Sequence, residues 1–143
     1  MKLEGFLKKP SSKEKIWAIE IPAIGIFTQG KSKKDAYLMA KDAIETVVDE
    51  KGFAVVIEPL GDLSFSVSAN EQRLLIGLLL RRQRAISGLT LMEVAKRLHS
   101  KSPNAYGRYE QGKVLPSLDK LAELLRAIDE DLDPILKIKD LAS

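Results

Sequence analysis

The sequence predicts an α+β protein whose first half has the element order β-β-β-α-β and whose second half is all helical. Three observations support this prediction: period-two alternation of apolar residues before residue 30, helical spacing after Ser32, and four successive helical patterns after residue 70. We divide the chain into residues 1–62 for the α/β part, 63–69 for a linker or short strand, and 70–143 for the helical part.

The opening residues predict a three-stranded meander. Apolar side chains alternate over residues 3–8 and again over 16–21, and a Pro10-containing turn separates the two runs. Pro22 ends the second strand, and a third apolar run over residues 26–29 ends at Gly30.

A helix is predicted from Ser32, which is suited to be its N-cap, to a stop at Gly52. Its apolar face comprises Ala36, Ala40, Ala43, Ile44, Val47 and Val48. Residues 53–58 read as a fourth strand, with Pro59 and Gly61 marking its exit. Residues 63–68 alternate again and are either a fifth short strand or an extended linker, a choice that the sequence leaves open.

The run from Ile16 to Gly30, followed by Asp35-Ala36 and the Ala-rich helix, resembles the N-terminal domain of HicB antitoxins. This resemblance implies a partial ribonuclease H-like fold that binds a small RNA-cleaving toxin, HicA, and covers its active site. We expect the toxin to contact the region of Ile24, Phe27 and the neighbouring strand ends, including Trp17. The resemblance implies no catalysis, and the strand carboxylates Glu4, Glu20 and Glu58 read as ordinary surface residues rather than as metal ligands.

Four helices are predicted in the second half. The first contains the leucine-rich run from Leu74 to Leu80 and ends at Gly88, and the second starts with the capping box Thr90-x-x-Glu93. The third is capped by Ser102, has Pro103 at its first position and runs to Gln111 before Gly112. The fourth covers Ser117 to Ile128.

Positive charge is concentrated in this half. Residues 1–68 hold ten lysines and ten acids, whereas residues 73–113 hold nine basic residues against Glu93 and Glu110, a net charge of +7. Such a block is typical of a phosphate-binding module, although a solvated helix face is the alternative.

The segment from Gly77 to Ile128 resembles the Cro/C1-type helix-turn-helix family. The residues that carry the resemblance are Gly88-Leu89-Thr90, Ala95, and the run from Arg108 to Lys113 followed by Pro116-Ser117-Leu118. The resemblance implies that double-stranded operator DNA is bound and that Arg84 and Glu110 form a buried ion pair. The sequence departs from the family at Leu91, Pro103 and His99 and has a turn one residue longer. The residues expected at the DNA are Asn104, Arg108, Ser102 and Pro103 near base edges, and Lys101, Lys113 and Arg97 at phosphates.

Composition excludes several function classes. The chain has no cysteine and one histidine, His99, so disulfides and thiol chemistry are excluded, and no metal site, cofactor or catalytic residue is expected. We therefore expect a protein that is not an enzyme. It lacks an apolar run near 18 residues and a signal pattern, so a cytoplasmic location is expected.

Together the two resemblances predict an antitoxin that blocks a HicA-type toxin, represses its own operon, and forms a homodimer or higher oligomer. The alternative is a stand-alone repressor whose α/β half senses a small molecule.

Overall fold

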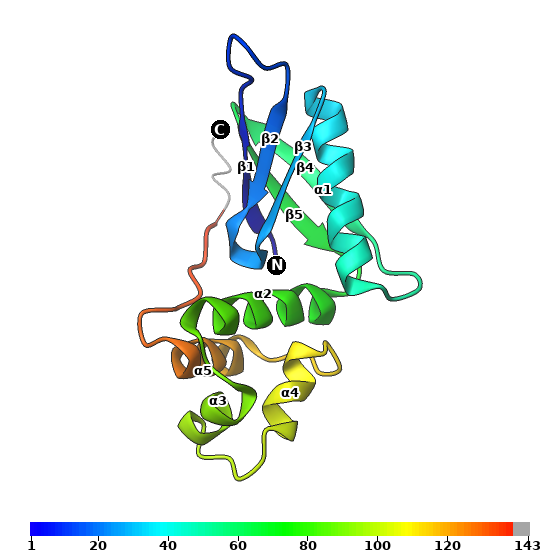
Figure 1. Cartoon of the computed structure of the whole chain (residues 1–143). Coiled ribbons are helices and arrows are strands. Elements are labelled where there is room, and N and C mark those ends of the chain that lie inside the picture. The colour runs from blue at the N-terminus through cyan, green and yellow to red at the C-terminus, as the bar shows by residue number, and fades with distance from the viewer. Residues whose placement is uncertain (139–143) are drawn as a thin grey trace.

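The computed structural model describes residues 1–138 and consists of a five-stranded sheet above a group of helices (Figure 1). Residues 139–143, the end of the predicted helical part, lie outside the described residues. The strands are β1 (Leu3–Lys8), β2 (Trp17–Ile21), β3 (Ile26–Gly30), β4 (Val55–Gly61) and β5 (Ser64–Ala69), and a 3-10 turn, η1 (Pro22–Ile24), joins β2 to β3. The helices are α1 (Lys33–Val48), α2 (Gln72–Ser87), α3 (Leu91–Arg97), α4 (Asn104–Glu110) and α5 (Leu118–Ile128).

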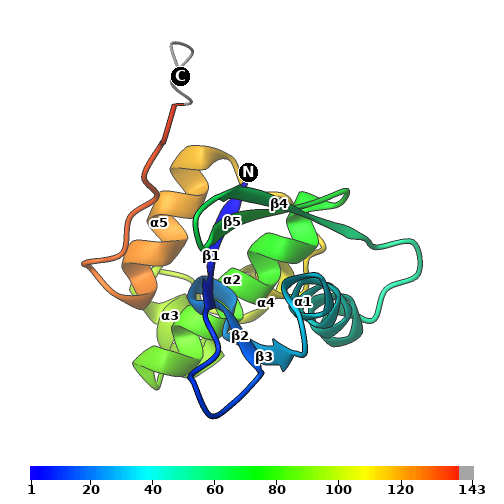
Figure 2. The ribbon, with the colours of Figure 1, turned by 90° about the horizontal axis from the view of Figure 1, so that it is seen from above.

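The sheet is antiparallel throughout, with the strand order β3-β2-β1-β5-β4. Helix α1 packs on one face, and the alternation in β1 turns Gly5 and Leu7 inward and Glu4, Phe6 and Lys8 outward (Figure 2). The mixed α/β class is confirmed. The ribonuclease H-like relationship stays a prediction.

The segment that the sequence left undecided is a strand in the middle of the sheet. β5 pairs with β1 on one side and β4 on the other. Residues 64–69 therefore belong to the sheet rather than to a linker. The predicted end of the fourth strand at residue 58 was wrong, because β4 continues through Pro59 to Gly61 with a shift in register. Pro59 is tolerated there because β4 is an edge strand and needs no second hydrogen-bonding partner.

Helix α1 confirms the predicted cap, because the Ser32 hydroxyl accepts a hydrogen bond from the Asp35 amide at 3.0 Å. Its predicted end was wrong. Asp49 takes the left-handed position at φ 49°, and Gly52, at φ 83°, lies in the turn that follows. Val47 was expected on the buried face but is 52% exposed, whereas Ala36, Ala40 and Ile44 are buried.

Helix α2 belongs to two hydrophobic cores. Leu74, Leu75 and Leu78 pack into the core between the sheet and α1. Ile76 and Leu80 point to the opposite side, into the core formed with α3, α4 and α5. The leucine-rich circumference seen in the sequence is thus explained, because α2 lies between the sheet and the other helices (Figures 1 and 2).

Local capping fixes the remaining helices. Thr90 and Glu93 form the predicted capping box of α3, and the Ser117 hydroxyl caps α5 by accepting from the Lys120 amide. None of the helices in residues 1–138 has the length and apolar character that a membrane crossing requires.

Candidate nucleic-acid interface

Helix α4 presents a polar face to solvent and a buried face to the protein. Asn104 and Arg108 are exposed and lie four residues apart, so they share one side of the helix. Tyr106 and Gly107 are buried, and the Tyr106 side chain lies in the core with α2, α3 and α5. The aromatic ring therefore anchors the helix rather than stacking on bases.

The start of α4 differs from the prediction by one residue. The helix begins at Asn104 and not at Pro103, which has helical angles but stands at the N-cap position. Ser102 still acts locally, because its hydroxyl accepts a hydrogen bond from the Asn104 amide at 3.2 Å. The predicted end at Gln111 was one residue too late, and Gly112 follows in the left-handed conformation at φ 70°.

The predicted ion pair is confirmed. Arg84 Nε lies 2.6 Å from one Glu110 carboxylate oxygen, and its NH2 group lies 2.9 Å from the other. Glu110 is 5% exposed, and the hydrogen bond to its carboxylate raises the pKa of Arg84. Arg84 also donates to the Leu89 carbonyl at 2.9 Å, so one side chain ties α2 to α4 and to the turn before α3.

Three other arginines of the basic block make contacts within the protein. Arg73 donates to the Gly112 carbonyl at 2.7 Å, and Arg81 donates to the Glu110 carbonyl at 3.4 Å. Arg97 was predicted to bind phosphate, but its guanidinium donates to the carbonyls of Ala127 and Ile128 at the end of α5. The sequence count of positive charge did not separate these structural arginines from residues free to meet DNA.

Within the basic block of residues 73–113, the exposed basic residues that remain are Lys96, Lys101, Arg108 and Lys113. Lys96 was not singled out in the sequence, although it stands next to Arg97 in the last turn of α3. His99 has φ 59°, a left-handed conformation that residues other than glycine adopt only rarely.

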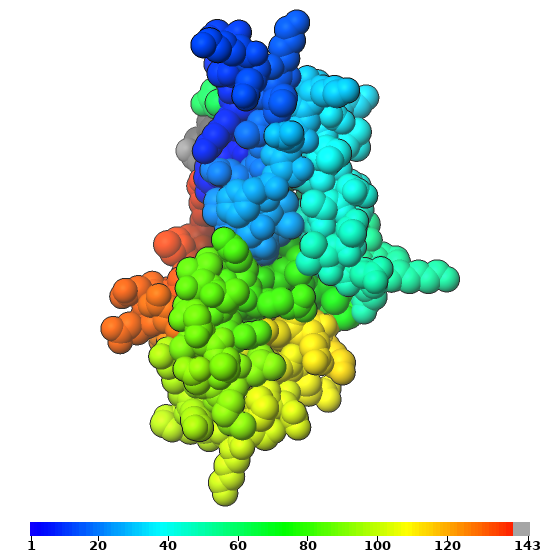
Figure 3. Space-filling model, viewed as in Figure 1, coloured from blue at the N-terminus to red at the C-terminus, as the bar shows by residue number. Residues whose placement is uncertain are grey.

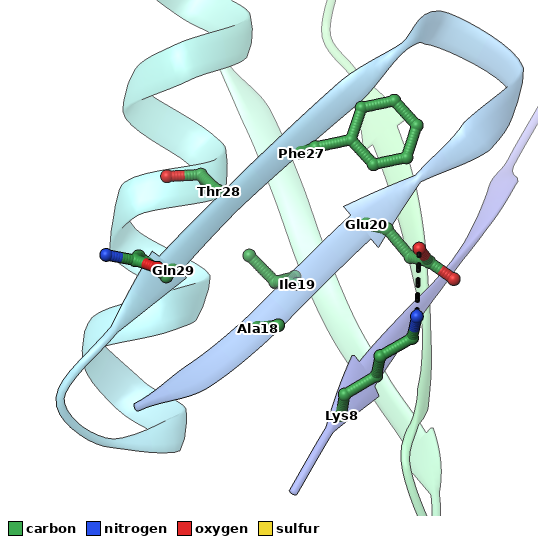
Figure 4. Close-up of a pocket in the computed structure, with 7 residues that line it drawn as sticks. All are labelled: Lys8, Ala18, Ile19, Glu20, Phe27, Thr28 and Gln29. Carbon is green, nitrogen blue, oxygen red and sulfur yellow. Dashed lines mark ion pairs between the residues drawn. The ribbon is translucent and has the colours of Figure 1, made fainter. Parts of the chain in front are cut away.

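The three residues predicted to contact a toxin differ in how far they are exposed to solvent. Phe27 is 58% exposed on the outer face of β3, beside a shallow hollow that Lys8, Ala18, Glu20 and Gln29 also line (Figure 4). Trp17 is half-buried, with Lys33 Nζ 5.4 Å from its ring centre. Ile24 is 7% exposed and belongs to the core between the sheet and α2, so its prediction as a surface contact is corrected.

The outer face of the sheet carries three glutamates. Glu4 and Glu58 flank Ser66 across neighbouring strands, and Glu20 stands between Phe6 and Phe27. Each pairs with a lysine, Glu4 with Lys137, Glu20 with Lys8 and Glu58 with Lys2. These carboxylates are therefore spread over the face rather than gathered at one point.

The comparisons support the helical half. A family model described as a helix-turn-helix domain matches residues 75–135. No curated protein matches the chain. The match covers α2 from Leu75 onward together with α3, α4 and α5, so this part of the protein is a helix-turn-helix domain, a class that binds DNA and regulates transcription.

Proposed function

We propose that the protein is an antitoxin of the HicB type, which represses its own operon through α4 and blocks a small HicA-type RNA-cleaving toxin with its sheet-containing half. Both activities are steric and require no catalytic group. The observation that carries the proposal is the exposed pair Asn104 and Arg108 on a helix that the Arg84–Glu110 pair fixes in place.

Asn104 and Arg108 have side chains that can form hydrogen bonds with the edges of DNA bases. An Asn amide can pair with adenine through two hydrogen bonds and an Arg guanidinium with guanine, each pair contributing about 1–3 kcal/mol of discrimination. Lys101 and Lys113 are exposed on either side of α4, where they can hold the phosphates that position the helix.

Two copies are expected on an operator, since helix-turn-helix proteins usually bind paired half-sites. Leu118 at the start of α5 is 53% exposed and Leu136 is 76% exposed. These apolar side chains supply a candidate contact between two copies.

The DNA-binding proposal is tested with a duplex from the region upstream of the gene. Asn104→Ala and Arg108→Ala should each weaken binding to this duplex by about 1–3 kcal/mol while sparing a duplex of unrelated sequence. Lys113→Ala should weaken binding to both duplexes and reduce the salt dependence by about one unit of log-log slope. Arg126→Ala, which removes an exposed arginine from α5, is the matched control. Unchanged affinity in both α4 variants would overturn the assignment of α4 as the reading helix.

The antitoxin role is supported by the HicB-like run over residues 16–30 and by Phe27, whose exposed ring offers an apolar contact on the outer face of β3.

Co-expression of the full chain with the product of the neighbouring gene tests this role. We expect the neighbour to be short and basic with one catalytic histidine, and to copurify with the wild-type protein. Phe27→Glu should abolish copurification, whereas Leu38→Glu, a matched change at an exposed leucine of α1, should not. A neighbour that does not associate with the wild-type protein would favour the alternative, a stand-alone repressor with a ligand-sensing α/β half.

A further inference from the structure

The sheet-containing half carries a strong charge separation that its neutral sequence conceals. Residues 8–15 and 31–35, which we call the basic tip, hold seven lysines against Glu14 and Asp35, a net charge of +5. The remainder of residues 1–62 holds three lysines against eight acids, a net charge of −5. The lysines of the tip are Lys8, Lys9, Lys13, Lys15, Lys31, Lys33 and Lys34.

Strand pairing brings the two segments of the basic tip together. Lys8 stands opposite Ala18 on β2, and Trp17 stands opposite Gly30 on β3, so the β1–β2 loop and the turn before α1 lie at the same end of the sheet. Lys33 Nζ lies 5.4 Å from the centre of the Trp17 ring, so the second segment reaches the start of β2, directly after the first segment. This end is opposite the helix-turn-helix domain (Figures 1 and 3).

The charges of the tip are accessible and weakly neutralised. All seven lysines are exposed. Among residues 1–138, only Lys8 of the seven has a carboxylate within ion-pair distance, that of Glu20 at 3.8 Å. The Asp35 carboxylate is occupied by the Lys31 main-chain amide, which donates to it at 2.9 Å. Six lysines of the tip thus have no carboxylate partner among residues 1–138, although the ammonium group of Lys33 lies over the Trp17 ring.

We propose that the basic tip is a second DNA-binding surface, which holds the phosphate backbone of duplex DNA without reading its sequence. Lysine suits this role because its ammonium is a compact charge without the planar fork with which arginine recognises guanine. The occupant is DNA because the opposite end of the molecule is a DNA-binding domain. A protein that is bound to one segment of DNA meets the neighbouring segments of the same DNA molecule at a high effective concentration.

The proposal rests on DNA binding by the helix-turn-helix domain and not on the antitoxin role. Because α4 and the tip lie at opposite ends of the molecule (Figure 1), we expect a duplex that is held by α4 to leave the tip free for a second segment of DNA. A bound molecule therefore bridges two segments of DNA.

The test is a bridging assay with the full chain. The upstream duplex is immobilised and saturated with protein, and capture of a labelled duplex of unrelated sequence is then measured over a range of salt concentrations. The tip variant is Lys9→Gln/Lys13→Gln/Lys15→Gln, in an exposed loop between strands. The control is Lys2→Gln/Lys51→Gln/Lys137→Gln, which removes the same charge from exposed positions outside the tip.

We expect the tip variant to capture at least tenfold less of the second duplex, with a log-log salt slope reduced by about 2.7, while its affinity for the upstream duplex is unchanged. The control should behave as the wild type does. In a dimer, the second helix-turn-helix domain could also capture the labelled duplex. This contribution is the same in the tip variant and the control variant, so it does not change the difference between them.

Equal capture by the tip and control variants would overturn the proposal. The proposal would also be overturned if the wild-type protein captured vesicles containing phosphatidylserine but did not capture the second duplex. The double variant Asn104→Ala/Arg108→Ala tests the role of α4 separately. If its affinity for the upstream duplex is unchanged, only the assignment of α4 as the reading helix is contradicted. The comparison of the tip and control variants stays valid, because both of them keep α4 intact.

Discussion

At the scale of single residues, the Arg84–Glu110 pair is the contact that most directly holds α4 against α2. Removing the Arg84 guanidinium would leave a carboxylate that is 5% exposed without its cation. We expect Arg84→Ala to lower the free energy of unfolding by about 3 kcal/mol, measured by urea denaturation.

Two variants complete the Arg84 experiment. Arg126→Ala removes an exposed pair with Asp133 and should cost less than about 0.5 kcal/mol. The double variant Arg84→Met/Glu110→Leu should be more stable than Arg84→Ala, because it leaves no buried charge unpaired. A loss in Arg84→Ala no larger than in Arg126→Ala would contradict the structural role of the pair.

Tyr106 gives the protein an alkaline limit of stability. Burial and, secondarily, the negative charge of the nearby Glu110 carboxylate raise the pKa of Tyr106 above its ordinary value of 10. The folded protein therefore keeps a proton that the unfolded chain loses, so this stability is complete below pH 10 and decreases above it. When the pH is raised from 10 to 11, the free energy of unfolding measured in urea should decrease by about 1 kcal/mol less for Tyr106→Phe than for the wild type. Identical losses would show that Tyr106 ionises as freely in the fold as in the unfolded chain.

The sequence predicted single residues well where a local or family pattern determines them. The Ser32 cap and the Thr90–Glu93 box depend on neighbours three residues away, and the structure confirms both. Ile24 was wrongly expected at the surface, and the contacts of Arg97 with α5 were not predicted, because the direction of each side chain depends on an element distant in sequence. Ile24 packs against α2, and Arg97 reaches the end of α5.

At the scale of elements, the crossing of α2 and α4 depends on Gly77. A Cβ atom at this position would lie 2.6 Å from the Glu110 carbonyl oxygen, which is backbone and cannot easily move. Gly77→Ala should therefore destabilise the protein by about 1–3 kcal/mol in urea unfolding and weaken operator binding.

Gly107 provides the matched control inside α4. A Cβ atom there meets nothing within 4 Å, so Gly107→Ala should increase stability by about 0.5–1 kcal/mol through higher helix propensity. If both alanine variants had the same stability, close approach at Gly77 would not be the factor that sets the helix crossing.

Strands were harder to predict than helices. The order and approximate limits of β1, β2 and β3 follow from alternation and prolines. The place of β5 between β1 and β4 does not, because strand pairing joins residues more than 60 positions apart, as in Leu3 with Val67. Alternation shows that residues 63–68 can be a strand but not which neighbours they would have.

At the scale of the whole molecule, α2 makes the two halves one cooperative unit. Leu75 and Leu80 are both fully buried, the first in the core with the sheet and the second in the core with the other helices. Leu75→Ala and Leu80→Ala should each cost about 3 kcal/mol. We expect Leu80→Ala to shift the unfolding of both halves together, although its contacts lie in the helical core.

Trp17, the single tryptophan, reports on the sheet, and far-UV circular dichroism reports mainly on the helices. The two signals should give coincident urea transitions in the wild type and in both variants. Ile86→Ala, at a position of α2 that is 60% exposed, should leave the transition unchanged. A Trp17 transition that stays in place when Leu80→Ala shifts the helical signal would show that the halves unfold separately.

The charge distribution also belongs to this scale. Counting along the chain located the basic helix-turn-helix segment, because its charges are close in sequence. The same count gave zero for the first 68 residues, since only strand pairing places residues 8–15 beside residues 31–35.

The position of α2 has a consequence for synthesis of the chain on the ribosome. The sheet is complete in sequence at Ala69, yet its core lacks Leu74, Leu75 and Leu78 until α2 has left the exit tunnel. Elongation proceeds at about 5–20 residues per second, so the nine further residues to Leu78 require about 0.5–2 s. During that interval the nascent sheet exposes the apolar surface that α2 later covers, and a chaperone that binds nascent chains would meet it there.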